Sequence, residues 1–379
     1  MIQDISQSPL FRIVNPRSIA FLGASNNFAS MGTSILSSLL YMGFEGRVYP
    51  VHPKEAEVQG LRAYAAVEDL PEVPDLAVMV LPTRITVEAL DACGRKGIRH
   101  AIVVTAGFRE VGGDGPALEA ELLAVARRHG IRFIGPNCIG VANPHQKLNT
   151  TFLPSRAVPG FVGLASQSGS FVTQMFDYLK MFGMGFSAAF SVGNAADTDL
   201  VDCLEYLGAC PNTRVIGLYV EGIPRGRDFI RLAREFLPNA LFANVSFVGS
   251  IPLLKELGRD AEGVIVTQVV PPFDSDLAGV TEYRRELAEH FPNEKPDFVS
   301  LEGFLAAKIF LAGLTKAGNS PTRESLVDAL ENLRGLDIGI GAPVSFGPDR
   351  HQASDRVWPS IIRGGSFVSL DWATLKAGM

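Results

Sequence analysis

The chain has little cysteine, no cysteine pair with metal-binding spacing and no excess of basic residues. Its four cysteines, Cys93, Cys138, Cys203 and Cys210, form no C-x-x-C motif, which argues against both a zinc site and a disulfide framework. The formal net charge of −6 argues against nucleic acid or an anionic membrane as a partner, although a local basic site can still bind phosphate. We therefore expect no metal site, no nucleic-acid partner and no membrane partner.

The chain also shows no targeting or membrane-spanning pattern. Residues 1–18 contain no basic segment followed by an apolar run, which is the pattern of a secretory signal. The most apolar helical stretch, Phe304–Leu314, is shorter than the ~20 residues that span a bilayer, and it contains Lys308. These absences predict a cytoplasmic protein.

Short apolar runs alternate with amphipathic stretches, which is typical of βαβ units around a mainly parallel sheet. The expected strands of a first sheet are Ser18–Leu22, Arg47–Val51, Leu76–Leu81, His100–Val104 and Arg132–Ile134. Those of a second series are Gly163–Ala165, Ser187–Ser191, Val215–Val220, Ala240–Phe247 and Gly263–Val270. The polar, proline-bearing residues 143–160 between the two series predict a linker.

The pattern changes after Pro271-Pro272. Three helical stretches follow in a row, at Ser275–Phe291, Ser300–Ala317 and Thr322–Asn332. The chain then ends in a β-rich tail with a hairpin turn at Gly364-Gly365. The whole is an α/β protein, with a distinct C-terminal part from residue 271 onward.

A candidate phosphate-binding turn follows the first expected strand. Residues Gly23, Ala24, Ser25 and Asn26 lie between this strand and a helix that begins after Gly32. Such a turn presents backbone N–H groups and the positive end of a helix to a phosphate. The spacing is not G-x-G-x-x-G, so NAD is not predicted. Alternatively, the turn only lets the strand pack closely on the helix.

Five segments at expected strand ends then occur in order: NPRSIAFLGAS, GFEGRVYPVHPK, DLAVMVLP, VVTAGFRE and GIRFIGPNCIGV. Together they resemble the CoA-binding domain of NDP-forming acyl-CoA synthetases and of the succinyl-CoA ligase α-subunit, and the resemblance extends over residues 10–235. It implies a nucleotide fold at residues 1–145 that holds coenzyme A across the carboxyl ends of its strands.

The resemblance also implies a set of CoA-contacting residues. Lys54 supplies a cation for a sugar phosphate, although His52 stands where the family usually has Asn. Leu81, Pro82 and Thr83 would pack against the adenine, unless they are only the residues at which a strand ends. A small-residue loop, Thr105, Ala106, Gly107 and Phe108, would approach the pantetheine arm. Asn137 and Cys138 would lie near the CoA thiol, with no catalytic role for Cys138, which is alternatively a buried structural cysteine.

A second candidate phosphate loop opens the following domain. Hydroxyls and free N–H groups gather where a helix starts, at Ser166, Gln167, Ser168, Gly169 and Ser170. Helix capping by a serine is the alternative for part of this cluster. In the family this loop belongs to a flavodoxin-like domain and holds the phosphate of a phosphohistidine.

The resemblance assigns further residues to the same phosphate site. Gly193 and Asn194, with Asp197 and Asp199 beyond them, match a second loop of that site. Glu221 matches the glutamate that orients the histidine, with a structural salt bridge as the alternative.

The phosphorylated histidine itself has no counterpart. None of the six histidines, His52, His100, His129, His145, His290 and His351, lies in the glycine-flanked segment expected after the next strand. A grasp-type nucleotide domain is not recognised either. We therefore expect no activation of a carboxylate by this chain alone, unless a partner supplies the histidine and an ATP-grasp domain with ATP or ADP and Mg.

From about residue 229 to 370 the chain instead resembles the end of branched-chain amino-acid-type periplasmic binding proteins, the substrate-binding components of ABC transporters. Glu262 matches a position where that family can hold an amino-acid ammonium group, although a structural role is favoured. We predict that this segment completes the second sheet within a domain at residues 160–270. Residues 271–379 would then pack as a cap.

Three hypotheses for the function follow. The first is a protein that binds CoA or acyl-CoA but has lost independent ligase chemistry. The second is a ligase subunit completed in trans by an ATP-grasp subunit. The third is an amino-acid sensor that uses the C-terminal segment. A homo-oligomer is compatible with each.

Overall fold

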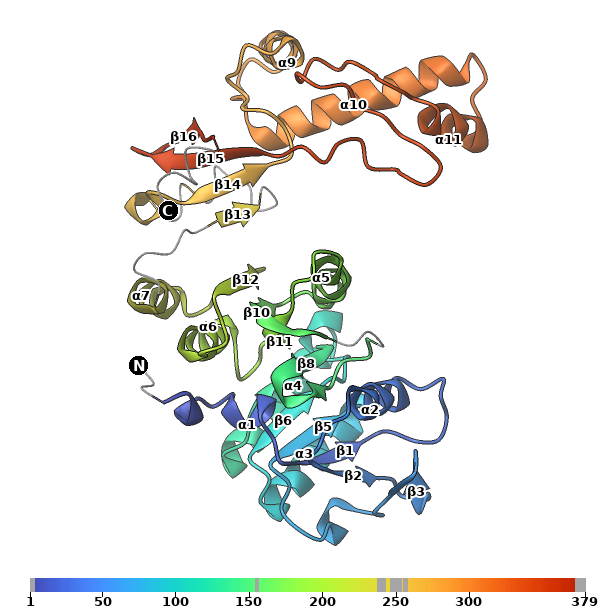
Figure 1. The fold of residues 1–379 in the computed structure, drawn as a ribbon, viewed down its shortest axis with the longest axis vertical. Helices are drawn as coiled ribbons and strands as arrows, with labels where there is room; N and C mark the ends of the chain where they lie inside the picture. Colours follow the sequence, from blue (N-terminus) through green and yellow to red (C-terminus); the bar gives the residue numbers. More distant parts are fainter. Residues whose placement is uncertain (1–3, 154–156, 237–242, 246–253, 255–257, 372–379) are drawn as a thin grey trace. The chain divides into compact units, whose positions relative to one another are not determined.

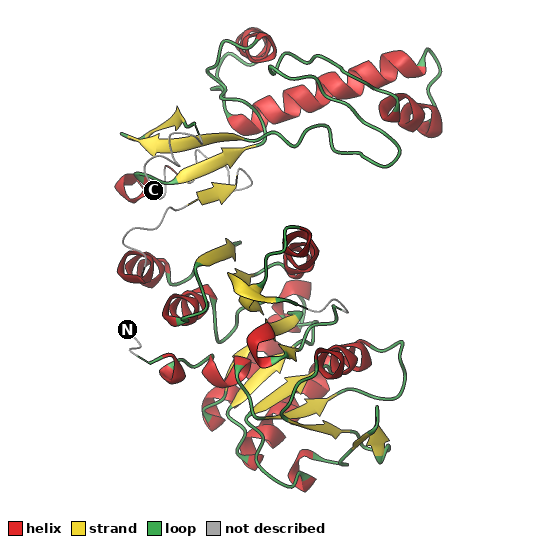
Figure 2. Cartoon of the chain, in the orientation of Figure 1, coloured by secondary structure: helices red, strands yellow, loops and turns green. Residues whose placement is uncertain are grey.

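The computed structural model describes residues 4–153, 157–236, 243–245, 254 and 258–371. The chain divides into two compact units, an N-terminal unit of residues 1–238 and a C-terminal unit of residues 239–379. Both units mix helices and strands, as Figure 2 shows. The α/β class predicted from the sequence is therefore confirmed.

The first sheet of the N-terminal unit is parallel, with the strand order β2-β1-β5-β6-β7. Its strands are β1 (Ser18–Leu22), β2 (Arg47–Val51), β5 (Leu76–Met79), β6 (His100–Val103) and β7 (Arg132–Ile134). The accompanying helices are α1 (Phe11–Val14), α2 (Met31–Met42), α3 (Thr83–Lys96) and α4 (Gly115–His129). Short elements complete this part: η1 (Ile5–Gln7), β3 (Glu57–Val58), β4 (Leu61–Arg62), η2 (Val67–Asp69) and η3 (Arg109–Val111).

Helices cover both faces of this sheet (Figure 1), because alternate strand residues point to opposite sides. Ile19 and Phe21 of β1 pack in one core cluster with Leu36 of α2. Ala20 and Leu22 pack in another cluster with residues of α3 and α4. All five residues of β1 are buried, as expected for a parallel strand covered on both faces. The five predicted strands of this sheet are confirmed to within two residues at each end.

The second sheet has the order β12-β10-β11-β8-β9. Its strands are β8 (Gly140–Asn143), β9 (Leu148–Asn149), β10 (Pro159–Ser166), β11 (Phe186–Ser191) and β12 (Val215–Tyr219). Its helices are α5 (Gly169–Met181), α6 (Leu200–Ala209) and α7 (Gly226–Phe236), and η4 (Pro144–Gln146) joins β8 to β9. Strands β10, β11 and β12 are parallel, whereas β8 is antiparallel to β11.

The prediction of a linker at residues 143–160 is therefore partly wrong, because β8 and β9 form a hairpin within the second sheet. Four of the polar residues that suggested a loop are buried and make hydrogen bonds, although the side-chain oxygen of Asn143 has no partner: Asn143, Asn149, Thr150 and Thr151. Asn143 donates to the carbonyl oxygen of Val14 at 2.9 Å, and the Thr150 hydroxyl accepts from the backbone N–H of Val141 at 2.9 Å. Buried polar groups with such partners look like loop residues in a sequence.

The C-terminal unit contains a four-stranded sheet with the order β13-β14-β15-β16. Its strands are β13 (Ala243–Val245), β14 (Ile265–Gln268), β15 (Trp358–Arg363) and β16 (Ser366–Ser369), and its helices are η5 (Gly258–Ala261), α9 (Ala278–His290), α10 (Phe298–Ala317) and α11 (Arg323–Glu331). The predicted hairpin turn is confirmed, with positive φ angles of 56° at Gly364 and 74° at Gly365.

The prediction that strands in residues 240–270 complete the second sheet is wrong. Strand β14 pairs with β13 on one side and with β15 of the C-terminal tail on the other, so its hydrogen-bonding edges are both occupied. Part of the predicted strand Ala240–Phe247 lies outside the described residues. The predicted packing of the later helices as a cap stays a prediction.

Helix α10 is longer than the apolar stretch seen in the sequence. It spans 20 residues and begins against the sheet of its own unit, where Phe298 packs edge-on against Phe367 at 5.9 Å (Figure 2). By length and composition alone α10 is able to span a membrane, a test that core helices of water-soluble proteins also pass. The sequence-based expectation of an apolar helix too short to span a bilayer is therefore corrected.

Candidate functional site

A cavity of about 450 Å³ lies at the carboxyl ends of β5, β6 and β7, next to the first turn of α5. Nine residues that the sequence marked as candidates line it: Leu81, Pro82, Thr83, Thr105, Ala106, Asn137, Cys138, Gln167 and Gly169. The sequence analysis missed the five other lining residues, because apolar side chains near loops carry no chemical signal: Met31, Val80, Val104, Ile139 and Phe152. Strand-end loops of the first sheet and the loop before α5 thus meet at one cavity.

The first glycine turn is shaped by close packing. Gly23 has φ +101°, and a Cβ there would lie 2.0 Å from the carbonyl oxygen of Val80. A Cβ on Gly32 would lie 2.1 Å from the carbonyl oxygen of Gly23. Both residues must be glycine for the strand, the turn and α2 to approach this closely. Close packing is therefore observed at this turn, and it leaves open whether the turn also binds a phosphate.

The polar side chains of the turn are already bonded within the protein. The backbone N–H of Ser25 donates to the Thr33 hydroxyl at 3.1 Å. The amide of Asn26 donates to the carbonyl oxygen of Glu57 and accepts from the N–H of Gln59, both at 2.9 Å. The residues Gly23, Ala24, Ser25 and Asn26 are outside the lining of the cavity. Phosphate binding at this turn stays a prediction.

Lys54 follows β2 and is exposed. Its backbone N–H donates to Nδ1 of His52 at 3.3 Å, which holds the start of the turn. Over the part of the chain that the structure describes, its ammonium group has no hydrogen-bond or ion-pair partner. This cation is therefore available to an anionic ligand, and its contact with a sugar phosphate stays a prediction.

The loop after β6 divides into lining and core residues. Thr105 is buried, and its hydroxyl accepts from the N–H of Leu81 at 3.2 Å. Gly107 adopts φ +99°, and its N–H donates to the Glu110 carboxylate at 2.6 Å. Phe108 is completely buried in the core between the first sheet, α3 and α4. The Phe108 side chain is therefore not available to a ligand, whereas the approach of this loop to the pantetheine arm stays a prediction.

Cys138 lines the cavity but is not an activated thiol. Its side chain is 5% exposed, and Sγ lies 3.4 Å from the carbonyl oxygen of Val103. Burial raises the pKa of this thiol to about 12. The nucleophilic thiolate is therefore almost absent at neutral pH, in agreement with the expected lack of a catalytic role.

The second candidate loop caps α5. The Ser168 hydroxyl accepts from the N–H of Phe171 at 3.4 Å, so the capping alternative is confirmed for this serine. Ser166 is buried and donates to the carbonyl oxygen of Ser168 at 2.7 Å, and the Ser168 and Ser170 hydroxyls lie 3.0 Å apart. The first N–H groups of α5, at Gly169 and Ser170, have no intrahelical partner and can receive an anion.

Asn194 is part of a buried network rather than an open phosphate loop. Its amide nitrogen donates to Glu110 at 2.6 Å and to Glu119 at 2.7 Å, and its oxygen accepts from the amide of Asn137 at 3.2 Å. A Cβ on Gly193 would lie 2.3 Å from the carbonyl oxygens of both Pro136 and Asn137. The expectation that the Asn194 side chain contacts phosphate is not supported by this arrangement, because its polar atoms are already bonded.

The two aspartates beyond this loop are ion-paired. Asp197 accepts from Nε of Arg132 at 2.9 Å, and Asp199 accepts from Nε of Arg225 at 2.8 Å. Arg225 also reaches Asp202 at 2.6 Å. These carboxylates therefore join β7 and the loop before α7 to the start of α6, and they do not face the Ser166–Ser170 loop as free groups.

Glu221 has an exposed side chain. Its backbone N–H donates to the side-chain oxygen of Gln167 at 2.6 Å, so the glutamate lies next to the cavity-lining loop. Within the described ranges its carboxylate has no ion-pair partner, so the salt-bridge alternative is not observed. Glu221 is free to contact a ligand or another group.

None of the six histidines lines the cavity. Two half-buried histidines have structural partners: His129 contacts Asp91 at 2.7 Å, and His100 lies 3.3 Å from the carbonyl oxygen of Asp75. The expected absence of the phosphorylated histidine stays a prediction.

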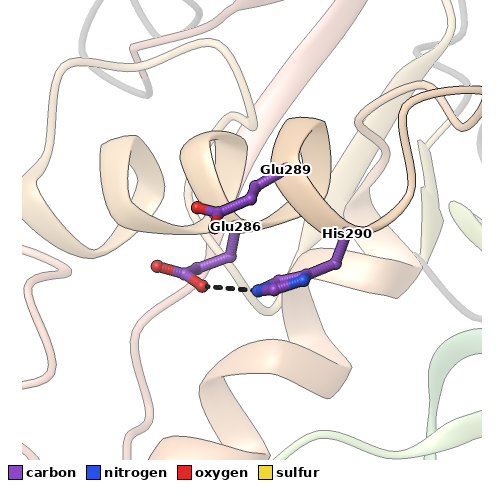
Figure 3. A group of neighbouring side chains, drawn as sticks. All are labelled: Glu286, Glu289 and His290. Atoms are coloured by element: carbon purple, nitrogen blue, oxygen red, sulfur yellow. Dashed lines mark ion pairs between the residues drawn. The ribbon is translucent and has the colours of Figure 1, made fainter.

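Figure 3 shows the one group of three potential metal ligands within the described ranges, Glu286, Glu289 and His290 on α9. Nε2 of His290 lies 3.5 Å from Oε2 of Glu286. The spacing of four residues places these two side chains together on one face of any helix. An exposed ion pair explains the group, and the expectation of no metal site stays a prediction.

Three family models match consecutive parts of the chain. A CoA binding domain matches residues 17–144, and a succinyl-CoA ligase like flavodoxin domain matches residues 159–239. A periplasmic binding protein model matches residues 225–365. The last two overlap along α7, where the sequence resemblance also changes.

Similar proteins include the α-subunit of acetate–CoA ligase [ADP-forming] II from Pyrococcus furiosus, 42% identical over 222 residues, which are 58% of this chain and 48% of that protein. The α-subunit of form I from the same organism is 38% identical over 59% of this chain and 49% of its own length. This chain thus spans about half the length of these two relatives.

Solved structures give the same result. A dinucleotide-forming acetyl-coenzyme A synthetase from Ca. Korarchaeum cryptofilum has a TM-score of 0.59 and 40% identity, covering 62% of this chain and 51% of the other. A protein from Pyrococcus horikoshii has a TM-score of 0.59 and 38% identity, over 62% and 54% of the two chains. Residues 17–239 are therefore homologous to the CoA-binding and flavodoxin-like domains of ADP-forming acetate–CoA ligases, and they are joined to a segment similar to periplasmic binding proteins.

Proposed function

We propose that the N-terminal unit binds coenzyme A or an acyl-CoA thioester in the cavity between its two sheets. The observation that carries this proposal is the composition of the cavity, which gathers the strand-end loops of β5, β6 and β7 with the first turn of α5. Open α/β sheets bind their ligands at this edge. The homology to CoA ligases supplies the identity of the ligand.

Groups at the carboxyl edge of the first sheet and at the start of α5 fit the two ends of CoA. The lining itself has no charged side chain, which suits the neutral pantetheine arm. The exposed ammonium group of Lys54, on the turn after β2, suits the sugar phosphate. The unpaired N–H groups at the start of α5 offer a second anion site next to the thioester end.

Calorimetric titration with CoA and with dephospho-CoA, which lacks the sugar phosphate, tests this proposal. The unchanged protein should bind CoA. Lys54→Ala should lower the affinity for CoA by about fivefold, because a single exposed ionic contact contributes at most ~1 kcal/mol. The affinity for dephospho-CoA should change little. The matched control is Lys180→Ala, an exposed lysine in the last turn of α5. Absence of CoA binding at millimolar ligand would reject the proposal.

A ligase subunit completed in trans is the second candidate. Two relatives bear the name of an α-subunit, and Glu221, held next to the Ser166–Ser170 loop by Gln167, would provide part of a phosphoryl-transfer site. A partner with an ATP-grasp domain would then supply ATP or ADP with Mg and the histidine. Incubation with labelled ATP and candidate partner subunits decides this question, since no labelled complex would form if the chain only binds CoA.

The amino-acid-sensor hypothesis has less support. The Glu262 carboxylate accepts from the N–H of Gly364 at 2.9 Å and so holds the turn between β15 and β16. This contact gives Glu262 a structural role that requires no bound amino acid. Recognition of an amino acid by the C-terminal unit stays a prediction, with a thermal shift by leucine as its test.

A further inference from the structure

A second cavity lies at the opposite edge of the first sheet. Its volume is about 390 Å³, which is within the range of small-molecule sites. Two of its lining residues mark the amino ends of neighbouring parallel strands: Arg17 immediately precedes β1, and Arg47 is the first residue of β2. The proposed CoA cavity lies at the carboxyl ends of the strands and shares no lining residue with this one. The two cavities are therefore separate.

The two arginines of this cavity are held side by side. The backbone N–H of Arg47 donates to the carbonyl oxygen of Arg17 at 3.0 Å. Nε and Nη2 of Arg17 donate to Asp75 at 2.9 and 3.1 Å, and the same two atoms of Arg47 donate to Glu72 at 2.8 and 2.9 Å. Neither carboxylate is among the described residues that line the cavity, so each holds one edge of a guanidinium group from outside. Over the described ranges the other N–H groups of both side chains have no partner.

A lysine adds to the positive charge of this lining. Lys147 follows η4, and its ammonium group pairs with Glu45 on the loop after α2. The two side chains are 53% and 78% exposed, so this pair is weak and can open. The ring of His145 already contacts a backbone carbonyl oxygen. The described part of the lining thus has three permanent cations, Arg17, Arg47 and Lys147, and one carboxylate. This excess favours an anion with more than one negative charge.

The arrangement of the donors favours phosphate over carboxylate. A carboxylate fits one edge of a single guanidinium group, and Asp75 and Glu72 already occupy such edges. A phosphate group distributes its charge over three oxygens, so guanidinium groups on neighbouring strands can bind different oxygens of one group. A second phosphate in the same molecule suits the ammonium group of Lys147, which binds as a point charge.

We propose that this second cavity binds a small molecule that carries a phosphate or pyrophosphate group, held by Arg17, Arg47 and Lys147. The site is independent of the proposed binding of CoA at the other edge of the sheet. The carboxylates of Asp75 and Glu72 keep the two guanidinium groups in place. Glu45 competes with the ligand for the ammonium group, so binding breaks the pair between Glu45 and Lys147.

Calorimetric titration of the full chain with pyrophosphate tests the site. The unchanged chain should bind pyrophosphate, and Arg47→Gln and Lys147→Gln should each lower the affinity by about tenfold, because each removes a hydrogen bond between charged groups. Glu45→Gln should instead raise the affinity by about threefold, because it removes the competing carboxylate. No binding at millimolar pyrophosphate, or equal affinity in all four proteins, would overturn the proposal and leave CoA binding intact.

The matched control is Arg95→Gln. Arg95 is 56% exposed, against 61% for Arg47, and it also pairs with carboxylates, but it does not line the cavity. Its change removes the same charge from the same unit and should leave the affinity for pyrophosphate unchanged. A loss equal to that of Arg47→Gln would assign the effect to net charge and overturn the site. Lys54→Ala should also leave this affinity unchanged, and a loss there would place the pyrophosphate at the CoA site instead.

Titration with malonate tests the preference for phosphate. Malonate places two carboxylates where pyrophosphate has two phosphates, and it should bind about tenfold more weakly. Equal or tighter binding of malonate would overturn the assignment to phosphate. Thermal unfolding checks that each variant folds. If Arg47→Gln does not fold, Glu45→Gln still decides, because its side chain is largely exposed and a purely structural ion pair predicts no gain in affinity.

Discussion

The side-chain oxygen of Gln167 accepts the backbone N–H of Glu221 at 2.6 Å and that of Gly222 at 3.0 Å. The side-chain nitrogen of the same glutamine donates to the carbonyl oxygen of Gly222 at 3.0 Å. One residue that lines the cavity thus holds the backbone that carries Glu221. The position of this glutamate therefore depends on a single neutral side chain.

Gln167→Ala should release the Glu221–Gly222 backbone without unfolding the unit. Each lost hydrogen bond is worth about 1 kcal/mol, so exchange of the amide hydrogens of these two residues should accelerate by roughly fivefold. Hydrogen-exchange mass spectrometry or NMR measures this directly. Gln352→Ala, in the C-terminal unit, should leave the exchange of residues 221 and 222 unchanged. Equal exchange in Gln167→Ala and the unchanged chain would contradict the link.

Arg225→Ala should destabilise the N-terminal unit through Asp199 and Asp202. Loss of a buried partner costs about 3–5 kcal/mol, but the Arg225 side chain is 41% exposed, so about 1–3 kcal/mol is expected. Thermal unfolding measures the loss, with the exposed Arg227→Ala as control. Asp202→Asn should restore part of the stability of Arg225→Ala, because it removes the carboxylate left without this partner.

The loss of stability in Arg225→Ala should also depend on pH. Burial raises the pKa of the Asp202 carboxyl above its ordinary value, and nearby Arg225 opposes this rise. A raised folded-state pKa gives stability that is present when the carboxyl is protonated and is lost as pH rises through that pKa. Removing Arg225 raises the pKa further, so the deficit of Arg225→Ala should be larger at neutral pH than at acidic pH. A deficit independent of pH would show that Asp202 does not depend on this guanidinium.

Cys138 should react slowly with thiol reagents in the folded protein. With a pKa of about 12, roughly one thiol in ten thousand is ionised at pH 8. The rate of alkylation at Cys138, followed by mass spectrometry, should still be rising above the ordinary thiol pKa of ~8.5. Rapid labelling at neutral pH with a plateau below that value would indicate an activated thiol and contradict the structural role.

Gly23→Ala and Gly60→Ala separate backbone strain from steric clash. Both glycines have positive φ, but a Cβ at Gly23 would lie 2.0 Å from the carbonyl oxygen of Val80, whereas Gly60 has nothing within 4 Å. Gly60→Ala should cost only the strain of about 1–2 kcal/mol, and Gly23→Ala should cost about 1–3 kcal/mol more. Thermal unfolding measures both, and equal losses would show that the close approach at Gly23 relaxes easily.

The first sheet and its ligand-facing loops were predictable from the sequence because their signals are local. Strands such as Ser18–Leu22 are buried on both faces and therefore read as short apolar runs. Small residues and hydroxyls at their ends, as at Thr105 and Ala106, mark the edge where such sheets bind ligands. The same holds for the serine cluster that caps α5.

The tertiary structure alone decided which of these residues share a cavity and which are already bonded. Asn194 meets Glu119 across 75 positions of sequence, and Asn143 meets Val14 across 129, so neither contact appears in a local pattern. Phe108 and Phe152 are both phenylalanines next to loops, yet one is in the core and the other lines the cavity. Composition and spacing determine where strands and turns form, whereas long-range packing determines which side chains remain free to bind a ligand.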